Sequence, residues 1–194
     1  AIPDSIHLPG KLAGYATRLR KVLASSPGRP VLSSQGGGYV LRVDPAAVDL
    51  CRFRDLAGRA AGVGDDEERC GLLRSALAQW SGAALSNLWG TRVESLRTTL
   101  DSERRSALLD YFDAQLRLGR PQEILTQLQT LTEERPYDEE LALRLVQAHC
   151  DSGNPAAALR AYEAVRARLD RELSTRPGEA LRAAGERLLH PVRP

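Results

Sequence analysis

Apolar residues recur at three- and four-residue spacing through most of the chain, the pattern of amphipathic α-helices. The spacing predicts helices at residues 12–23, 46–61, 66–80, 92–118, 121–134, 138–151, 155–173 and 178–189. In the first of these, the apolar stripe is formed by Leu12, Tyr15, Ala16, Leu19 and Leu23. Segments containing glycine and proline separate them. Only the runs VLSS and YVLRV, on either side of Gly36, Gly37 and Gly38, differ, because they read as two short strands around a turn. The predicted fold class is therefore mainly α, with one β-hairpin.

Two of these helical segments repeat at an offset of 34 residues. Gly119-Arg120-Pro121 aligns with Gly153-Asn154-Pro155. The flanking matches are Leu109 with Leu143, Ala114 with Ala148, Leu125 with Leu159, and Leu128 with Tyr162. Thirty-four residues is the tetratricopeptide period, in which each helical hairpin buries its apolar face by stacking on the next. We therefore predict stacked hairpins at 108–134 and 142–168, with 46–80 as a candidate third member and the long helix at 92–118 as a bridge.

Composition supports a helical core. The chain has 194 residues, of which 31 are Leu and 26 are Ala, whereas Phe, Trp and Tyr total nine. Small aliphatic residues with high helix propensity suit packed helices and fit an all-β sandwich poorly. The residues expected between the repeats are Tyr111, Phe112, Leu116 and Leu145.

Charge separates the start of the chain from the rest. The whole sequence has a net charge of +2, but residues 1–44 carry six basic and two acidic side chains, and residues 45–194 carry 21 and 23. The basic segment is the candidate for binding a polyanion. A basic helix fits the major groove of DNA, and a hairpin tip reaches the neighbouring minor groove. The alternative is an ordinary amphipathic helix with a solvated basic side.

Other polar clusters favour no chemistry. The acidic runs at 65–68, 133–134 and 139–140 coincide with helix boundaries, where carboxylates cap helices and complement the dipole. His7, His149 and His190 have no ligand partner three or four residues away, and no nucleophile motif occurs. The glycine cluster leads into a strand without the Lys-Ser/Thr of a phosphate loop. We therefore predict no enzyme, no metal and no cofactor.

The cysteines and tryptophans are interpreted as packing residues. Cys51, Cys70 and Cys150 are widely spaced, which favours small core residues in a reducing cytosol over disulfides or zinc. Trp80 and Trp89 flank the connection at 80–90 and are interpreted as packing a junction between hairpins, with anchoring of a partner as the alternative. No apolar run is long enough for a membrane span. The missing initiator Met suggests that the chain starts inside a longer protein.

Two sets of motifs resemble known domains. YATRLRKVL (15–23) and VLSSQGGGYVLRVDP (31–45) resemble the recognition helix and wing of OmpR-type winged helix-turn-helix domains. AVDLCRF (47–53), LLRSALAQWSGAAL (72–85), SERRSALLDYFDAQLRLGRPQEIL (102–125) and SGNPAAALRAYEAVRARLDRELSTRPGEALR (152–182) resemble the bacterial transcriptional activation domain. Their combination is similar to the Streptomyces antibiotic regulatory protein family. The implied domains are the C-terminal part of a winged helix-turn-helix at 1–44 and a tetratricopeptide-like activation domain at 45–194.

The resemblance implies a cytoplasmic transcription activator that binds direct repeats in double-stranded promoter DNA. Its protomers would lie side by side as a homodimer, recruit RNA polymerase including its σ factor, and control a secondary-metabolite gene cluster. The alternative is a tetratricopeptide-like scaffold that binds a protein or peptide and has no DNA recognition of its own.

The same resemblance assigns roles to individual residues. Arg18 matches the base-reading arginine, Arg20 and Lys21 match positions that contact DNA or its backbone, and Tyr39 matches the tyrosine that packs the wing onto the helix. The full DNA-binding set is Lys11, Tyr15, Thr17, Arg18, Arg20, Lys21, Ser33, Ser34 and Gln35. Gln35 occupies the place of a minor-groove arginine, a departure that weakens the case for wing insertion.

A winged helix of this type also has an N-terminal sheet and two helices before its recognition helix. The resemblance therefore leaves two alternatives. Either the native protein has upstream residues that this sequence lacks, or the chain is a fragment that does not dock on DNA in the usual way.

Overall fold

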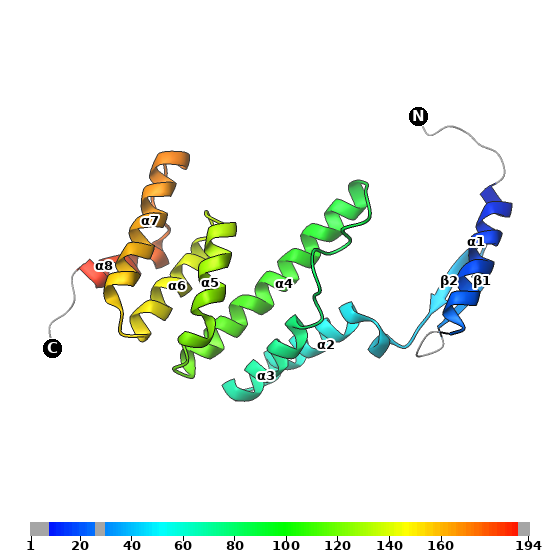
Figure 1. Cartoon of the computed structure of the whole chain (residues 1–194), viewed down its shortest axis with the longest axis horizontal. Coiled ribbons are helices and arrows are strands. Elements are labelled where there is room, and N and C mark those ends of the chain that lie inside the picture. Colours follow the sequence, from blue (N-terminus) through cyan, green and yellow to red (C-terminus); the bar gives the residue numbers. More distant parts are fainter. Residues whose placement is uncertain (1–7, 26–29, 190–194) are drawn as a thin grey trace. The chain divides into compact units, whose positions relative to one another are not determined.

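The computed structural model describes residues 8–25 and 30–189, with side chains from Leu12 onward. Internal contacts divide the chain into two compact units, residues 1–55 and 56–194. The structure does not describe residues 26–29, the side chain of Lys11, or His7 and His190. Figure 1 labels the elements of both units along the chain.

The first unit contains one helix, one hairpin and the first residues of a second helix (Asp49–Gly62), in which the boundary between the units falls. Helix α1 (Leu8–Leu23) precedes strands β1 (Val31–Gln35) and β2 (Gly38–Arg42), which pair antiparallel with Val31 opposite Arg42. Gly36 and Gly37 have φ angles of 58° and 78°. A two-residue turn of this kind needs left-handed backbone at both positions, which glycine adopts without steric cost. The hairpin predicted from the glycine cluster is confirmed. A short 3-10 turn, η1 (Pro45–Ala47), follows, capped by the Asp44 side chain.

The second unit is helical. Helix α2 (Asp49–Gly62) leads into α3 (Asp66–Leu77), α4 (Thr91–Arg117), α5 (Gln122–Glu134), α6 (Glu139–Asp151), α7 (Pro155–Leu173) and α8 (Glu179–Leu189). Asp65, Asp138 and Asn154 cap α3, α6 and α7 by accepting hydrogen bonds from backbone N–H groups in the first turn. The mainly α fold predicted from the sequence is confirmed.

The 34-residue repeat is visible in the backbone. Gly119 and Gly153 have φ angles of 67° and 71°, the left-handed conformation that ends a helix. The Arg120 N–H donates to the Gln115 carbonyl at 3.0 Å, and the Asn154 N–H donates to the His149 carbonyl at 2.9 Å. Corresponding donors and acceptors are 34 residues apart. The two hairpins therefore share one turn geometry, which turns α5 back from α4 and α7 back from α6.

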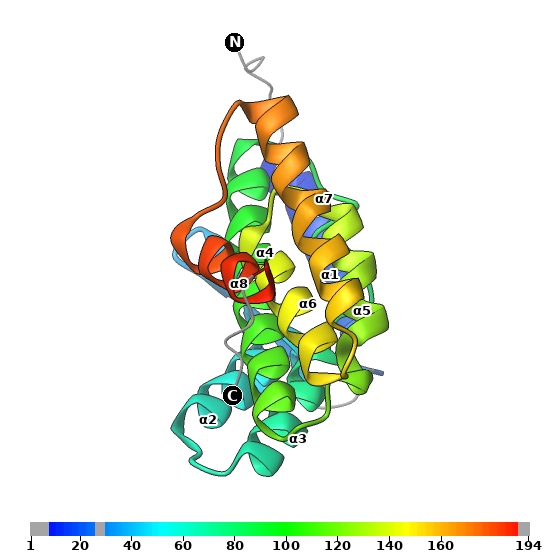
Figure 2. The ribbon, with the colours of Figure 1, turned by 90° about the vertical axis from the view of Figure 1, so that its left-hand side faces the viewer.

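The helices stack as a repeat array. Helix α4 packs against α3 and also against α5 and α6. The long helix therefore connects α3 to the helices that follow it, as predicted for the bridge at 92–118. Helix α6 packs against α5, α7 and α8, and Figure 2 shows these helices in a second view. At Gly185 of α8 an added Cβ would lie 2.3 Å from the Tyr162 ring of α7. A larger residue would separate these helices, so glycine permits their close approach.

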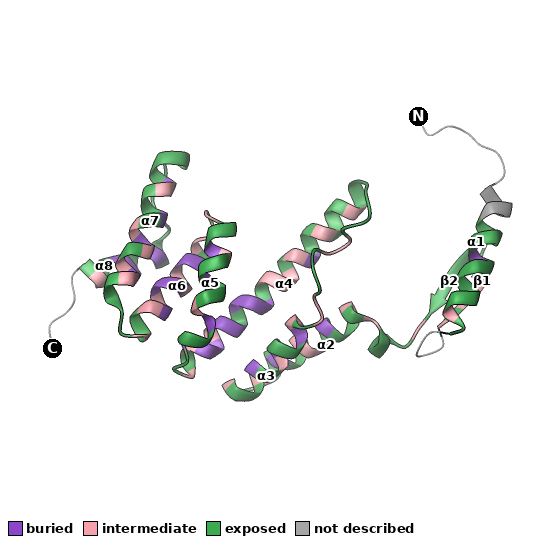
Figure 3. Cartoon of the chain, in the orientation of Figure 1, coloured by how far each residue is buried: buried purple, intermediate pink, exposed green. Residues whose placement is uncertain are grey.

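Buried side chains follow the contacts between helices of the array (Figure 3). Phe112, Ile124 and Leu128 are fully buried, and Tyr111 and Leu145 are also in the core. The predicted packing of Tyr111, Phe112 and Leu145 is confirmed, while Leu116 is half-buried. This core explains why Leu and Ala dominate the sequence.

Three predictions about packing are wrong. Cys70 is buried, but Cys51 and Cys150 are exposed, in the first and last turns of their helices, where neighbours cover less surface. Trp80 is half-buried under the Arg104 guanidinium, so the packing prediction fails for Trp89 alone. Trp89 is 85% exposed, because hydrogen bonds from Arg97 to backbone carbonyls hold its loop without the indole.

The third is the apolar side of α1. Helix α1 contacts β1 along a narrow face, so Ala16 is its one buried residue among those described. Leu12, Tyr15 and Leu19 belong to the predicted apolar stripe but are exposed.

Candidate nucleic-acid interface

The basic side of α1 faces solvent. Ala16 is 3% exposed and marks the side of α1 that is covered. Arg18 and Lys21 are exposed and lie about 200° and 140° around the helix from Ala16, at ~100° per residue. They are also three residues apart, so they share one surface of the helix. Two cations therefore project together from the uncovered side of α1.

Arg20 joins this helix to the hairpin. Its Nε donates a hydrogen bond of 2.9 Å to the carbonyl oxygen of Leu32 in β1. Its guanidinium carbon lies 5.6 Å from the centre of the Tyr39 ring in β2, within cation–π range. Both strands therefore contact one arginine of α1. Tyr39, matched above to the tyrosine that packs the wing onto the helix, meets α1 through this side chain.

The other predicted DNA-binding residues fall into two groups. Tyr15 projects into solvent, and the Thr17 hydroxyl donates to the Ala13 carbonyl of its own helix at 2.9 Å. In the hairpin, Ser33 pairs with Val40, Ser34 with Tyr39, and Gln35 with Gly38. Ser34 and Gln35 are exposed beside the turn, whereas Ser33 is half-buried. Lys11 lies in α1, where only the backbone is described.

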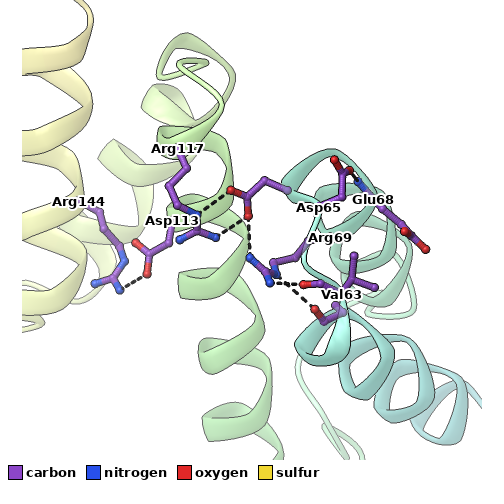
Figure 4. A network of polar contacts seen from close by, with 9 residues as sticks. Val63, Asp65, Glu68, Arg69, Asp113, Arg117 and Arg144 are labelled. Carbon is purple, nitrogen blue, oxygen red and sulfur yellow. Dashed lines mark hydrogen bonds and ion pairs between the residues drawn. The ribbon is translucent and has the colours of Figure 1, made fainter.

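A network of ion pairs connects α3, α4 and α6 in the second unit (Figure 4). Asp66 accepts two hydrogen bonds of 2.8 Å from Arg117 and one of 2.6 Å from Arg69. Arg69 also donates to the carbonyl oxygens of Ala60 and Val63. The hydrogen bonds from Arg117 are the main cause that lowers the pKa of the Asp66 carboxyl. Asp66 therefore holds the start of α3 to the end of α4.

Two further contacts extend the network. Glu67 pairs with Arg120 at 2.8 Å, and Asp113 pairs with Arg144 of α6 at 2.7 Å. Beside these residues is a groove of about 300 Å³, lined by Ala60, Ala61, Arg69, Leu73, Asp110, Asp113 and Arg117. Its charged residues are mostly engaged in ion pairs, which fits a structural role.

A second cluster fixes the start of α6. Arg105 donates to both carboxylate oxygens of Asp138, at 2.7 and 2.6 Å, and to Glu140 at 2.6 Å. Burial raises the pKa of Asp138, but the hydrogen bonds from Arg105 and from the backbone outweigh it, so the pKa is lowered overall. The acidic run at 139–140 lies at a helix boundary, as the sequence predicts, but both side chains also have distant partners. Glu140 binds Arg105, and Glu139 accepts a hydrogen bond from the Gly178 N–H.

Sequence reasoning missed these partners because they are distant in the chain. Asp66 and Arg117 are 51 residues apart, and Arg105 and Asp138 are 33 apart. For the first pair the available signal was an acid in the first turn of one helix and an arginine in the last turn of another, whereas Arg105 lies in the middle of α4 and gives no such signal. Among the described residues no group of acidic, His or Cys side chains is placed to hold a metal ion. No helix within the described ranges is long and apolar enough to cross a membrane.

Together these features define a tetratricopeptide-like helical-repeat domain preceded by the recognition helix and hairpin wing of a winged helix-turn-helix. Residues 48–189 match the family described as "Bacterial transcriptional activator domain". The chain belongs to this family, which confirms the resemblance drawn from its motifs.

Named relatives are regulators. The chain is 34% identical over 178 residues to Regulatory protein AfsR of Streptomyces griseus, covering 90% of this chain and 18% of AfsR. It is 35% identical over 181 residues to Transcriptional regulatory protein EmbR of Mycobacterium tuberculosis, covering 90% and 47%. It is 33% identical over 187 residues to Transcriptional regulator RedD of Streptomyces coelicolor, covering 93% and 53%. The chain therefore spans about half the length of EmbR and RedD and less than a fifth of AfsR.

A solved structure has the same fold. Mycobacterium tuberculosis EmbR, in complex with a low affinity phosphopeptide, superposes with a TM-score of 0.85 at 30% sequence identity. The match covers 99% of this chain and 53% of the EmbR chain. The similarity thus includes both the helix with its hairpin and the helical array.

Proposed function

We propose that this chain belongs to a transcription activator that binds direct repeats in double-stranded promoter DNA and recruits RNA polymerase, including its σ factor. The protein acts in the cytoplasm, as a homodimer on DNA, on a secondary-metabolite gene cluster. The names of the relatives support the regulatory role. The observation that carries the DNA-binding part is the exposed pair of Arg18 and Lys21 on a helix tied to a hairpin by Arg20.

The proposed roles follow from side-chain chemistry. An arginine fork binds guanine O6 and N7 in the major groove, whereas a lysine ammonium binds phosphate as a point charge. Arg18 is therefore the base reader and Lys21 the phosphate contact, with Lys11, Tyr15 and Thr17 on the same helix. Arg20 orients the wing, so that Ser33, Ser34 and Gln35 approach the backbone beside the groove.

Footprinting on genomic fragments tests DNA binding, using the native gene product that contains these residues. The expected result is protection of two direct repeats in moderate salt. Arg18→Ala should weaken the specific site by about 1–3 kcal/mol and relax the preference at one base pair. Lys21→Ala should weaken all sequences alike and reduce the salt slope by about 1.

Arg160→Ala is the matched control, because Arg160 is an exposed arginine on α7 in the other unit. It should leave both the affinity and the salt slope unchanged. Binding of promoter repeats no tighter than binding of random DNA would overturn the DNA-binding proposal.

Single-round transcription with purified RNA polymerase tests recruitment separately. Transcript yield should rise with the activator on a promoter that carries the repeats, and not on one with scrambled repeats. Unchanged yield despite an intact footprint would contradict recruitment and leave DNA binding standing.

A further inference from the structure

An exposed apolar surface lies at the start of α4. Trp89 is 85% exposed, Leu88 is 50% exposed and Leu96 is 55% exposed. Arg92 lies between them in sequence, four residues before Leu96 and therefore on the same side of the helix. We call Leu88, Trp89, Arg92 and Leu96 the anchor surface. Large exposed aromatic residues of this kind are enriched among the residues that dominate protein interfaces.

The loop that carries Trp89 is held in one conformation. Arg97 of α4 donates to the carbonyl oxygens of Ala84, Leu85 and Leu88 at 3.0, 2.9 and 3.2 Å. Leu85 has a φ of 53°, a left-handed conformation that is unusual for leucine and that these bonds support. Because the loop is already ordered, binding through Trp89 would lose little conformational entropy.

The anchor surface has one unpaired cation. Arg97 forms an ion pair of 2.6 Å with Glu94, which leaves Arg92 without a partner among the residues that the structure describes. Residues 84–97 therefore carry a local net charge of +1, from Arg92, Arg97 and Glu94. A complementary surface would combine apolar contacts with a carboxylate.

This chain has such a surface where α5 and α7 end. Tyr137 is 47% exposed and Leu173 is 52% exposed. The Tyr137 hydroxyl donates to Glu172 at 2.5 Å, which places the turn after α5 beside the end of α7. We call Tyr137 and Leu173, with the carboxylates of Glu133, Glu134, Asp170 and Glu172, the acidic surface.

The net charge of the acidic surface is opposite in sign to that of the anchor surface. Residues 133–137 and 168–173 contain those four carboxylates and three arginines, Arg135, Arg168 and Arg171, a local net charge of −1. Within the described part of the chain, Glu133, Glu134 and Asp170 have no ion-pair partner. The acidic surface therefore complements the anchor surface, because it combines apolar side chains with unpaired carboxylates.

We propose that the anchor surface of one copy binds the acidic surface of a second copy of this chain. Figure 1 shows the start of α4 and the end of α7 well separated within the helical array. A contact between two different patches is heterologous, so it relates successive copies head to tail. The same arrangement would place protomers side by side on direct repeats, and that use rests on the proposed function. The self-contact does not need DNA.

Sedimentation equilibrium of the full chain without DNA measures the contact. The weight-average mass of the wild type should rise with concentration. Trp89→Ala/Arg92→Glu removes the anchor surface, and Glu134→Arg/Glu172→Arg removes the acidic surface. Each variant should associate about 30-fold more weakly, the effect of losing a dominant interface residue. Leu189→Ala, at an exposed leucine outside both surfaces, is the control and should associate like the wild type.

Mixing the two double variants gives the decisive result. Each retains the patch that the other lacks, so an equimolar mixture should form a 1:1 heterodimer and nothing larger. A symmetric contact would not be restored by mixing. A wild type that stays monomeric, or a mixture that stays monomeric, overturns the proposal. Far-ultraviolet circular dichroism confirms that the variants are folded.

Two further measurements separate this proposal from others. Loss of RNA polymerase binding in Trp89→Ala/Arg92→Glu with unchanged self-association would assign the anchor surface to polymerase and overturn the second-copy proposal. Binding of the native protein to a single half-site reports on DNA recognition alone. If half-site binding fails while the mixture still dimerises, the proposed function fails and the self-contact stands.

Discussion

The two units of this chain are stabilised differently. In the hairpin unit, α1 meets the strands through the buried Ala16 and through polar contacts of Arg20, and Val31, Val40 and Leu41 are exposed. In the helical array, apolar side chains such as Phe112, Ile124 and Leu128 are fully buried between helices. The array therefore has its own hydrophobic core, whereas the hairpin unit depends on a few polar contacts, chiefly those of Arg20. Substitutions should therefore act very differently in the two units.

The largest effect is expected from the core of the array. Phe112→Ala should reduce the free energy of unfolding by about 3–5 kcal/mol, because it leaves a cavity at a fully buried site. Urea denaturation followed by circular dichroism measures it. Leu41→Ala in β2 is the matched change in the other unit and should alter stability by less than about 0.5 kcal/mol. Equal losses from the two changes would contradict the comparison.

Close packing of α7 and α8 gives the next effect. Gly185→Ala should destabilise the array by about 1–3 kcal/mol, because the new methyl group meets the Tyr162 ring. Gly71→Ala is the control, since Gly71 lies inside α3 with open space around its Cα. That change should stabilise the protein by about 0.5–1 kcal/mol through helix propensity. If Gly71→Ala destabilised the protein as much as Gly185→Ala, the steric explanation would be wrong.

Polar contacts within the array are expected to matter less than its core. Asp138→Asn retains a good helix cap but removes the ion pair with Arg105, so it should cost about 1 kcal/mol near neutral pH. The pKa of Asp138 is lower in the folded state than its ordinary value of 3.8. The stabilisation is therefore present above pH 3.8 and is lost as pH falls through the folded pKa.

Chemical denaturation at several pH values measures this loss. The difference in unfolding free energy between wild type and Asp138→Asn should shrink below pH 3.8. A difference that is the same at acidic and neutral pH would assign the loss to something other than the carboxylate charge.

The smallest effect is expected in the hairpin unit. Arg20→Ala removes the hydrogen bond to Leu32 and the contact with the Tyr39 ring. Both are exposed to water, so together they should contribute less than about 1 kcal/mol. Hydrogen exchange of β1 and β2 amides should become faster, with no change in the array. Arg18→Ala, which removes an exposed arginine from the same helix, should leave that exchange unchanged. Faster exchange in both variants would show that Arg20 does not hold the hairpin.

Most of the fold followed from local patterns. The glycines at 36–37 predicted the hairpin turn because their conformation depends on neighbouring residues alone. The 34-residue offset predicted both helical hairpins. Gly119 and Gly153, both in the left-handed conformation, explain why the two turns share one sequence pattern. In the array the largest errors, of three residues, are at the start of α2 and the end of α3.

The contacts that determine the candidate interface were harder to predict. Nothing in the sequence near Arg20 indicates that its Nε binds a carbonyl 12 residues away, because this bond depends on how the hairpin packs against α1. The exposure of Trp89 was missed for a similar reason, since an arginine holding a loop by its backbone leaves no hydrophobic signal. The resemblance supplied the DNA-binding set, and the geometry added which arginine braces the wing.

The matching turns at Gly119 and Gly153 also bear on how the chain reaches its native state. Each turn joins helices that are adjacent in sequence, so the contacts between α4 and α5 and between α6 and α7 span short loops. Folding is fast when contacts are local, and repeat arrays nucleate in one hairpin and propagate to the next. The C-terminal hairpins can thus form as soon as they leave the ribosome, without waiting for distant strands. Alanine at either glycine would slow this first step, because its side chain disfavours the left-handed turn that closes the hairpin.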